Sequence, residues 1–135
     1  MAARYMLDTN ICIYLIKQQP RKVLDRFQET APGEIAISAV TVAEMMFGIA
    51  KSRRQEENRS ALEAFLAPLE MVDFDFTAAQ HYGAIRARLE KMGTPIGAYD
   101  MLIAAQARSL GLVLITNKER EFHRVPDLTV ENWAA

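Results

Sequence analysis

Short apolar runs alternate along this chain with segments that have helical periodicity. The runs that favour strands cover residues 4–8, 35–38 and 112–116, and the segments between them place apolar residues three and four positions apart. Strands that alternate with helices predict a parallel sheet that is covered by helices on both faces. We therefore expect an α/β fold, a three-layer α/β/α sandwich with a central, mainly parallel sheet.

Local signals predict where several elements begin and end. Thr41 and Thr77 are expected to cap the helices that follow them, because a threonine oxygen can accept a hydrogen bond from a free helix amide. Gly93 and Gly111 are expected to end two further helices. The other predicted segments are a polar connection between two helices at 51–60, a half-exposed strand at 71–76 and an edge strand within 128–133.

The size and composition of the chain suit a single cytoplasmic domain. Its 135 residues are 50% apolar, which is enough to build one core, so we expect one domain over residues 1–135. No apolar stretch approaches the roughly 20 residues of a membrane-spanning helix, and no signal peptide is apparent. Cys12 is the only cysteine, which excludes an internal disulfide and predicts a small buried side chain in a reducing compartment.

The net charge of the chain does not by itself indicate a nucleic-acid-binding protein. The chain carries 16 basic and 17 acidic residues, so a polyanionic ligand must be attracted by a local basic patch or by a bound metal ion. The basic residues that could contact an RNA backbone, each of which could equally be an ordinary surface charge, are Lys51, Arg53, Arg54, Arg86, Arg88 and Lys118.

Acidic side chains are expected to gather at one edge of the predicted sheet. Asp8 follows the first strand, Glu44 lies in the helix after the second, and Asp100 begins a helix after a loop with glycine and proline. In parallel α/β sheets, ligands bind at the carboxyl ends of the strands. Taken singly, Asp8 and Asp100 could be helix caps and Glu44 a surface residue.

Together these carboxylates predict a metal site. Carboxylates that are brought close repel one another unless a cation neutralises them. A set of oxygen ligands without a histidine or cysteine cluster suits Mg²⁺ or Mn²⁺ better than zinc. A metal ion in such a site activates water for phosphodiester hydrolysis, and a carboxylate can orient that water or take its proton. His81 and His123 are interpreted as structural or surface residues.

Four stretches of the chain, in this order and spacing, resemble the VapC-type PIN-domain toxins of bacterial type II toxin–antitoxin pairs. They are "MLDTNICIYLI", "ISAVTVAEMMFGIAKS", "GTPIGAYDMLIAAQA" and "LVLITNKEREF". The third and fourth further resemble the subgroup that cleaves initiator tRNA in its anticodon loop. The resemblance implies a PIN-like fold and a magnesium-dependent endoribonuclease, with manganese as a possible substitute.

The resemblance also implies roles for individual residues. Asp8 and Asp100 match the two metal-binding aspartates of the family, and Glu44 matches its helix glutamate. Many PIN domains have a further acid where this chain has Lys118, so Glu121 is expected to act as the fourth catalytic acid, with Glu119 as the alternative. The residues expected to support these acids are Thr9, Asn10, Thr116, Asn117 and Glu119.

The resemblance implies partners as well: an RNA substrate, expected to be a tRNA, a VapB-like antitoxin and a second copy of the chain in a homodimer, but no membrane. Met45, Met46 and Phe47 put apolar surface on several sides of one helix. This pattern is equally consistent with a helix wholly buried in its own core.

Two other functions are compatible with parts of the sequence. A receiver-type phosphoacceptor domain is also an α/β sandwich, but it needs an aspartate after a central strand, and residues 35–38 run into Ala39, Val40 and Thr41 instead. A catalytically degenerate PIN domain could act as a binding module, which the presence of Asp8, Glu44 and Asp100 argues against.

Overall fold

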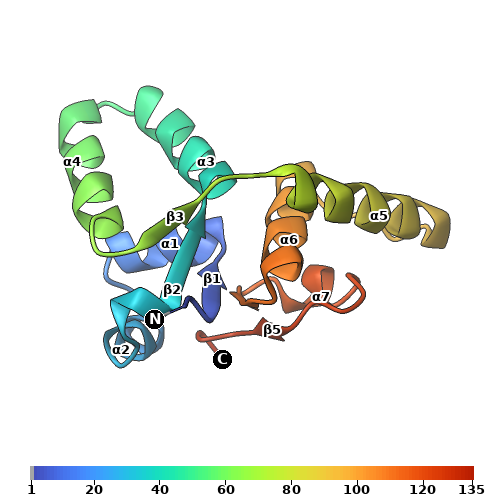
Figure 1. Cartoon of the computed structure of the whole chain (residues 1–135). Helices are drawn as coiled ribbons and strands as arrows, with labels where there is room; N and C mark the ends of the chain where they lie inside the picture. Colours follow the sequence, from blue (N-terminus) through green and yellow to red (C-terminus); the bar gives the residue numbers. More distant parts are fainter. Residues whose placement is uncertain (1) are drawn as a thin grey trace.

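The computed structural model describes residues 2–135, which form one five-stranded sheet (Figure 1). The strand order is β3-β2-β1-β4-β5, and every neighbouring pair is parallel, as the alternation of strands and helices predicts. The strands are β1 Tyr5–Leu7, β2 Ile35–Ser38, β3 Glu70–Val72, β4 Val113–Ile115 and β5 Val130–Glu131.

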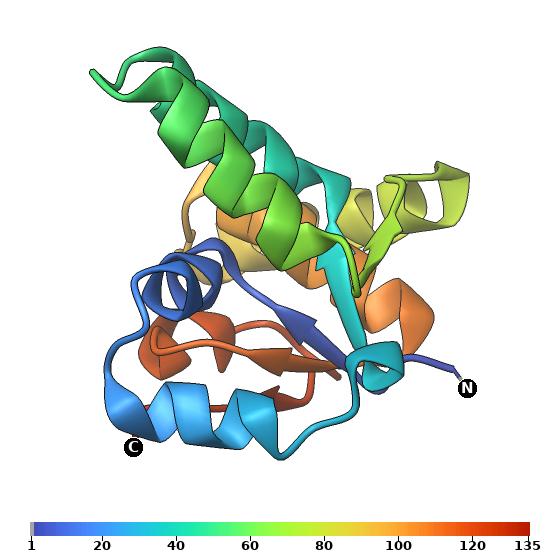
Figure 2. The same cartoon turned by 90° about the vertical axis from the view of Figure 1, so that its left-hand side faces the viewer.

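Helices cover both faces of the sheet and complete the expected three-layer sandwich. One face packs against the first four helices and the other against the last three (Figure 1). The helices are α1 Thr9–Ile16, α2 Arg21–Gln28, α3 Ala39–Ala50, α4 Gln55–Leu66, α5 Phe76–Met92, α6 Ala98–Leu110 and α7 Glu119–Phe122, with a 3-10 turn at Pro32–Glu34. Figure 2 shows α3 and α4 as a pair of helices that extends beyond the sheet.

The alternation of side chains along the strands builds the two cores. Met6 and Leu114 point to the α5–α6 side, whereas their neighbours Leu7 and Ile115 point to the side of α1 and α2. All four side chains are fully buried, because both faces of a parallel sheet are covered. This is why the strands read as continuous apolar runs in the sequence.

Two of the predicted helix caps are wrong. Ser38 caps α3, since its hydroxyl accepts a hydrogen bond from the Val40 amide at 3.0 Å, and Thr41 is already inside the helix and buried. Asp75 caps α5 by accepting from the Ala78 amide at 2.9 Å, so Thr77 lies in the first turn. In both cases the chain turns into the helix earlier than the threonine, and an oxygen in the preceding residues reaches the free amides first.

Two predicted segments are shorter than expected. The connection between α3 and α4 ends at Arg54, because α4 begins at Gln55 with Glu56 and Glu57 in its first turn, where negative charge favours a helix start. Of the strand expected at 71–76, only Met71 and Val72 pair with β2; the strand that forms, Glu70–Val72, begins one residue earlier, and the chain then turns into α5.

Other expectations are confirmed. Gly93 and Gly111 end α5 and α6 with φ angles of 69° and 68°, a backbone region that favours glycine. Cys12 is buried in the core, and burial raises the pKa of its thiol. His81 has a structural role, because its Nδ1 accepts a hydrogen bond from Arg108 at 2.9 Å. Within residues 2–135, no helix combines the length and the apolar character needed to cross a membrane.

Strand order determines which chain segments meet at the carboxyl edge of the sheet. β1 lies between β2 and β4, with Leu7 opposite Ile115 and Met6 opposite Ala36. The residues that follow these three strands therefore lie side by side although they are far apart in sequence.

Candidate active site

Asp8 occupies the centre of this edge and also caps α1. Its Oδ1 accepts a hydrogen bond from the Ile11 amide at 2.9 Å, and its Oδ2 accepts one from the hydroxyl of Thr116, the residue after β4. The same carboxylate can therefore cap α1 and bind a ligand, because each of its oxygens has a second lone pair that these hydrogen bonds leave free.

Burial makes the charge of Asp8 costly. The residue is only 2% exposed, and this desolvation raises its pKa to about 6. The hydrogen bonds from Thr116 and Ile11 and the positive charge of Lys118 act in the opposite direction, and the carboxylate of Asp100 adds to the rise. A buried carboxylate with a second carboxylate nearby is an environment in which a cation is strongly stabilised.

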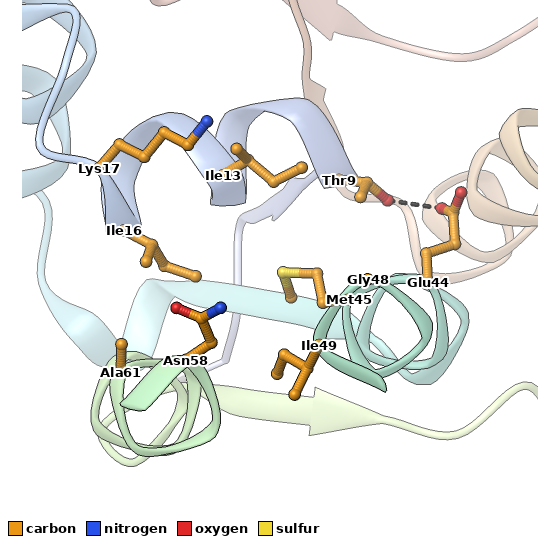
Figure 3. Close-up of a pocket in the computed structure, with 10 residues that line it drawn as sticks. All are labelled: Thr9, Ile13, Ile16, Lys17, Glu44, Met45, Gly48, Ile49, Asn58 and Ala61. Carbon is orange, nitrogen blue, oxygen red and sulfur yellow. Dashed lines mark hydrogen bonds between the residues drawn. The ribbon is translucent and has the colours of Figure 1, made fainter. Parts of the chain in front are cut away.

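Glu44 is held beside Asp8 through the next residue of the chain. The hydroxyl of Thr9 donates a hydrogen bond to Glu44 Oε1 at 2.6 Å, which joins the start of α1 to α3 (Figure 3). The hydroxyls of Thr9 and Thr41 lie 3.3 Å apart, so Thr41 supports the same contact from inside α3. Glu44 also borders a pocket of about 370 Å³ between α1, α3 and α4, which is lined largely by apolar side chains such as Ile13 and Ile49 (Figure 3).

Asp100 reaches the site from the first turn of α6 and pairs with Lys118. Lys118 Nζ lies 3.2 Å from Asp100 Oδ2, and both groups act electrostatically on Asp8. Gly97 leaves room for this arrangement, because a Cβ at that position would lie 3.3 Å from the same Asp100 oxygen.

The remaining predicted residues have other partners. The Asn117 side chain donates to the Tyr14 hydroxyl at 2.6 Å, and the Glu119 carboxylate accepts from Asn132 at 3.2 Å. Within residues 2–135, no hydrogen bond or ion pair joins Asn10, Glu119 or Glu121 to Asp8, Glu44 or Asp100.

Sequence reasoning missed two of the supporting side chains. The sequence predicts Thr41 only as a cap and gives no signal for Tyr14. Their contacts span 32 and 103 residues of sequence, respectively, and no local pattern signals a contact over such a separation.

The donor set fits a hard divalent cation. No group of three His, Cys, Asp or Glu side chains in the described part of the chain is placed to hold a metal ion. Mg²⁺, however, keeps several of its waters and is commonly held by one or two carboxylates. Asp8 and Asp100 are two carboxylates that could hold such an ion, and the burial of Asp8 favours a cation beside it. An α/β fold with carboxylates at the carboxyl edge of its sheet is the arrangement expected of a metal-dependent nuclease.

Comparison with known proteins identifies the family. Residues 5–128 match the PIN domain family, and the chain belongs to it. It is 44% identical over 131 residues to the tRNA(fMet)-specific endonuclease VapC of Shigella flexneri, a match that covers 97% of this chain and 98% of the relative. It is 48% identical over 130 residues to ribonuclease VapC2 of Haemophilus influenzae strain Rd, covering 96% and 98%.

Solved structures agree with this assignment. The DNA-bound VapBC complex of Salmonella typhimurium contains a chain with a TM-score of 0.92 and 44% identity to this one, covering 97% of this chain and 98% of the other. The VapBC2 complex of Rickettsia felis bound to a promoter DNA fragment gives a TM-score of 0.90 at 42% identity, covering 96% and 98%. The VapC-type PIN family and the nuclease class expected from the sequence are confirmed, and the receiver-domain alternative loses its support.

Proposed function

We propose that the whole chain, residues 1–135, works as one magnesium-dependent endoribonuclease domain, the toxin of a toxin–antitoxin pair. The proposed reaction is hydrolysis of a phosphodiester bond in the anticodon loop of initiator tRNA. The similarity to a tRNA(fMet)-specific endonuclease supports the substrate. The single observation that carries the chemistry is the buried Asp8 carboxylate, which has Asp100 nearby and is adjacent in the chain to Thr9, the hydrogen-bond partner of Glu44.

We assign Asp8 and Asp100 as metal ligands, with Mn²⁺ as a possible substitute for Mg²⁺. When bound, the ion lowers the pKa of a coordinated water and offsets charge on the phosphate oxygens. Thr116 holds Asp8 in one orientation through its hydroxyl. The Ile11 amide holds the other oxygen of Asp8. The carboxylate therefore presents its free lone pairs to the metal ion in a fixed direction.

Glu44 is proposed to orient the attacking water and to accept its proton. The Thr9 hydrogen bond fixes one carboxylate oxygen and leaves the other free for this task. Glu121 is proposed as the fourth catalytic acid. The supporting residues of the proposal are Thr9, Asn10, Thr116, Asn117 and Glu119.

Cleavage of purified tRNA by variants tests this proposal. The wild-type protein is expected to cut initiator tRNA in the anticodon loop with Mg²⁺ and to be inactive with EDTA, whereas Asp8→Asn removes cleavage. Asp25→Asn, an exposed carboxylate on α2, is the matched control and is expected to retain full activity. Full cleavage by folded Asp8→Asn would refute the assignment. Magnesium binding without cleavage by the wild type would instead favour the degenerate binding module.

We propose that a VapB-like antitoxin inhibits the enzyme in the cytoplasm. The structural neighbours named above are toxin–antitoxin complexes, which supports such a partner. The apolar pocket between α1, α3 and α4 borders Glu44, so a partner that fills it would cover this carboxylate from that side.

We also propose a homodimer. Three consecutive apolar residues of α3 differ in exposure: Met45 is buried and Met46 half-buried, but Phe47 is 66% exposed. Tyr99 of α6 is 59% exposed, and together with Phe47 and Glu44 it lines a second pocket, separate from the one between α1, α3 and α4. Two exposed aromatic residues at one site favour a second copy as the partner, and light scattering of wild type and Phe47→Ser measures whether the dimer depends on this surface.

A further inference from the structure

Lys118 introduces a positive charge among the acids of the proposed metal site. Within residues 2–135, Lys118 forms the one ion pair that involves Asp8, Glu44 or Asp100, with Nζ 3.2 Å from Asp100 Oδ2. Its backbone is fixed on both sides: its amide donates to Thr116 Oγ1 at 2.9 Å, and its carbonyl accepts from the Phe122 amide at 3.2 Å. Because the Lys118 backbone is held in place, its side chain keeps the ammonium group close to Asp100.

The same ammonium group acts on both proposed metal ligands. It pairs directly with Asp100, and its charge lowers the pKa of Asp8 against the effect of burial. Because the Lys118 side chain is 38% exposed and that of Asp100 is 20% exposed, the ammonium group can move into water without leaving a buried charge behind. A divalent cation that binds the Asp100 carboxylate competes with Lys118 for the same negative charge, and it would repel the ammonium group.

We propose that the Lys118 ammonium group occupies the divalent-cation site at Asp100 in the metal-free protein. The cation displaces this ammonium group when it binds. This inference rests on the proposed metal-dependent function. Metal binding is then an exchange of one cation for another. In the metal-free enzyme, the Lys118 ammonium group already neutralises part of the negative charge of the acids. Lys118 thereby sets the concentration of divalent cation at which the site fills.

Titration calorimetry of Mn²⁺ into the metal-free full-length protein, without RNA, tests the proposal. Lys118→Met removes the charge but keeps the length of the side chain, and it is expected to lower the dissociation constant about five-fold or more, since a competing ion pair and a like charge are removed. Lys118→Arg keeps the charge and is expected to bind Mn²⁺ as the wild type does or more weakly. Lys22→Met, an exposed lysine on α2, controls for the change in net charge and is expected to leave affinity unchanged.

Three results would overturn the proposal. An unchanged or higher dissociation constant in Lys118→Met shows that the lysine does not compete with the cation. An equal gain in Lys22→Met shows that net charge alone is responsible, and an equal gain in Lys118→Arg shows that the ammonium charge is irrelevant. If Lys118→Met does not melt cooperatively, Lys118→Gln replaces it. Failure of the wild type to cleave tRNA contradicts the proposed function but leaves the metal titration interpretable, so the two failures can be told apart.

Discussion

Replacing Asp8 with asparagine is expected to stabilise the metal-free protein while it removes activity. Burial raises the pKa of Asp8 from 3.8 to about 6, which corresponds to about 3 kcal/mol at 1.36 kcal/mol per pKa unit. Because the pKa is higher in the folded state, stability falls as the pH rises from about 4 to 6, where the unfolded chain ionises first, and the cost is fully present above pH 6. The side-chain oxygen of asparagine can still accept from the Ile11 amide, and its NH2 group can donate to the Thr116 hydroxyl, which reverses that bond without restoring the charge.

Thermal and urea unfolding in EDTA measure this effect. At pH 7.5 the variant is expected to exceed the wild type by up to about 3 kcal/mol, or about 10 °C in melting temperature for a chain of this size. The advantage is expected to shrink to about 1 kcal/mol near pH 4.5, since there most of the cost in the wild type is absent. Added Mg²⁺ stabilises only the wild type and narrows the gap. A variant that is less stable at pH 7.5, or whose advantage does not depend on pH, would refute the electrostatic reasoning.

Three other substitutions test the site and the fold. Glu44→Gln is expected to lower the cleavage rate about 100-fold or more at an unchanged melting temperature. Thr9→Val is expected to lower the rate less, because the Glu44 carboxylate remains and loses only its 2.6 Å hydrogen bond. Single-turnover cleavage assays compare the two variants. Gln106→Leu is expected to cost about 2–3 kcal/mol in urea unfolding, since the buried amide bonds Ser38 and the Asp73 carbonyl; a loss below 0.5 kcal/mol would contradict that role. Gly93→Ala is expected to destabilise by about 1 kcal/mol because φ is 69°, whereas Gly83→Ala, inside α5 with open space around it, is expected to stabilise by a similar amount.

The strands, and the edge of the sheet at which Asp8 lies, could be predicted because the signals are local. Residues 35–37 are continuously apolar because both faces of β2 are buried, and the parallel arrangement then places Asp8 and the helix of Glu44 at one edge. The glycine stops at 93 and 111 have the same local character, since their positive φ angles favour glycine over other residues.

The details that were not predicted depend on contacts between distant residues. Residues 73–76 have the alternation of a strand, but pairing with β2 ends at Val72. The side-chain amide of Gln106 in α6 instead donates a hydrogen bond to the carbonyl of Asp73. Similarly, nothing near Lys118 in the sequence indicates that its ammonium group contacts Asp100, because this depends on the path of the chain between β4 and α7. The role of Glu121 stays a prediction for the same reason.

The hydrogen bond between Thr116 and Asp8 has a consequence for the timing of biosynthesis. Its two partners are separated by 108 residues, and β4 must be inserted beside β1 before they can meet. The ribosome therefore makes the Asp8 carboxylate 108 residues before the hydroxyl that orients it. Until β4 has been made and has paired with β1, the growing chain lacks the hydrogen bond that orients Asp8.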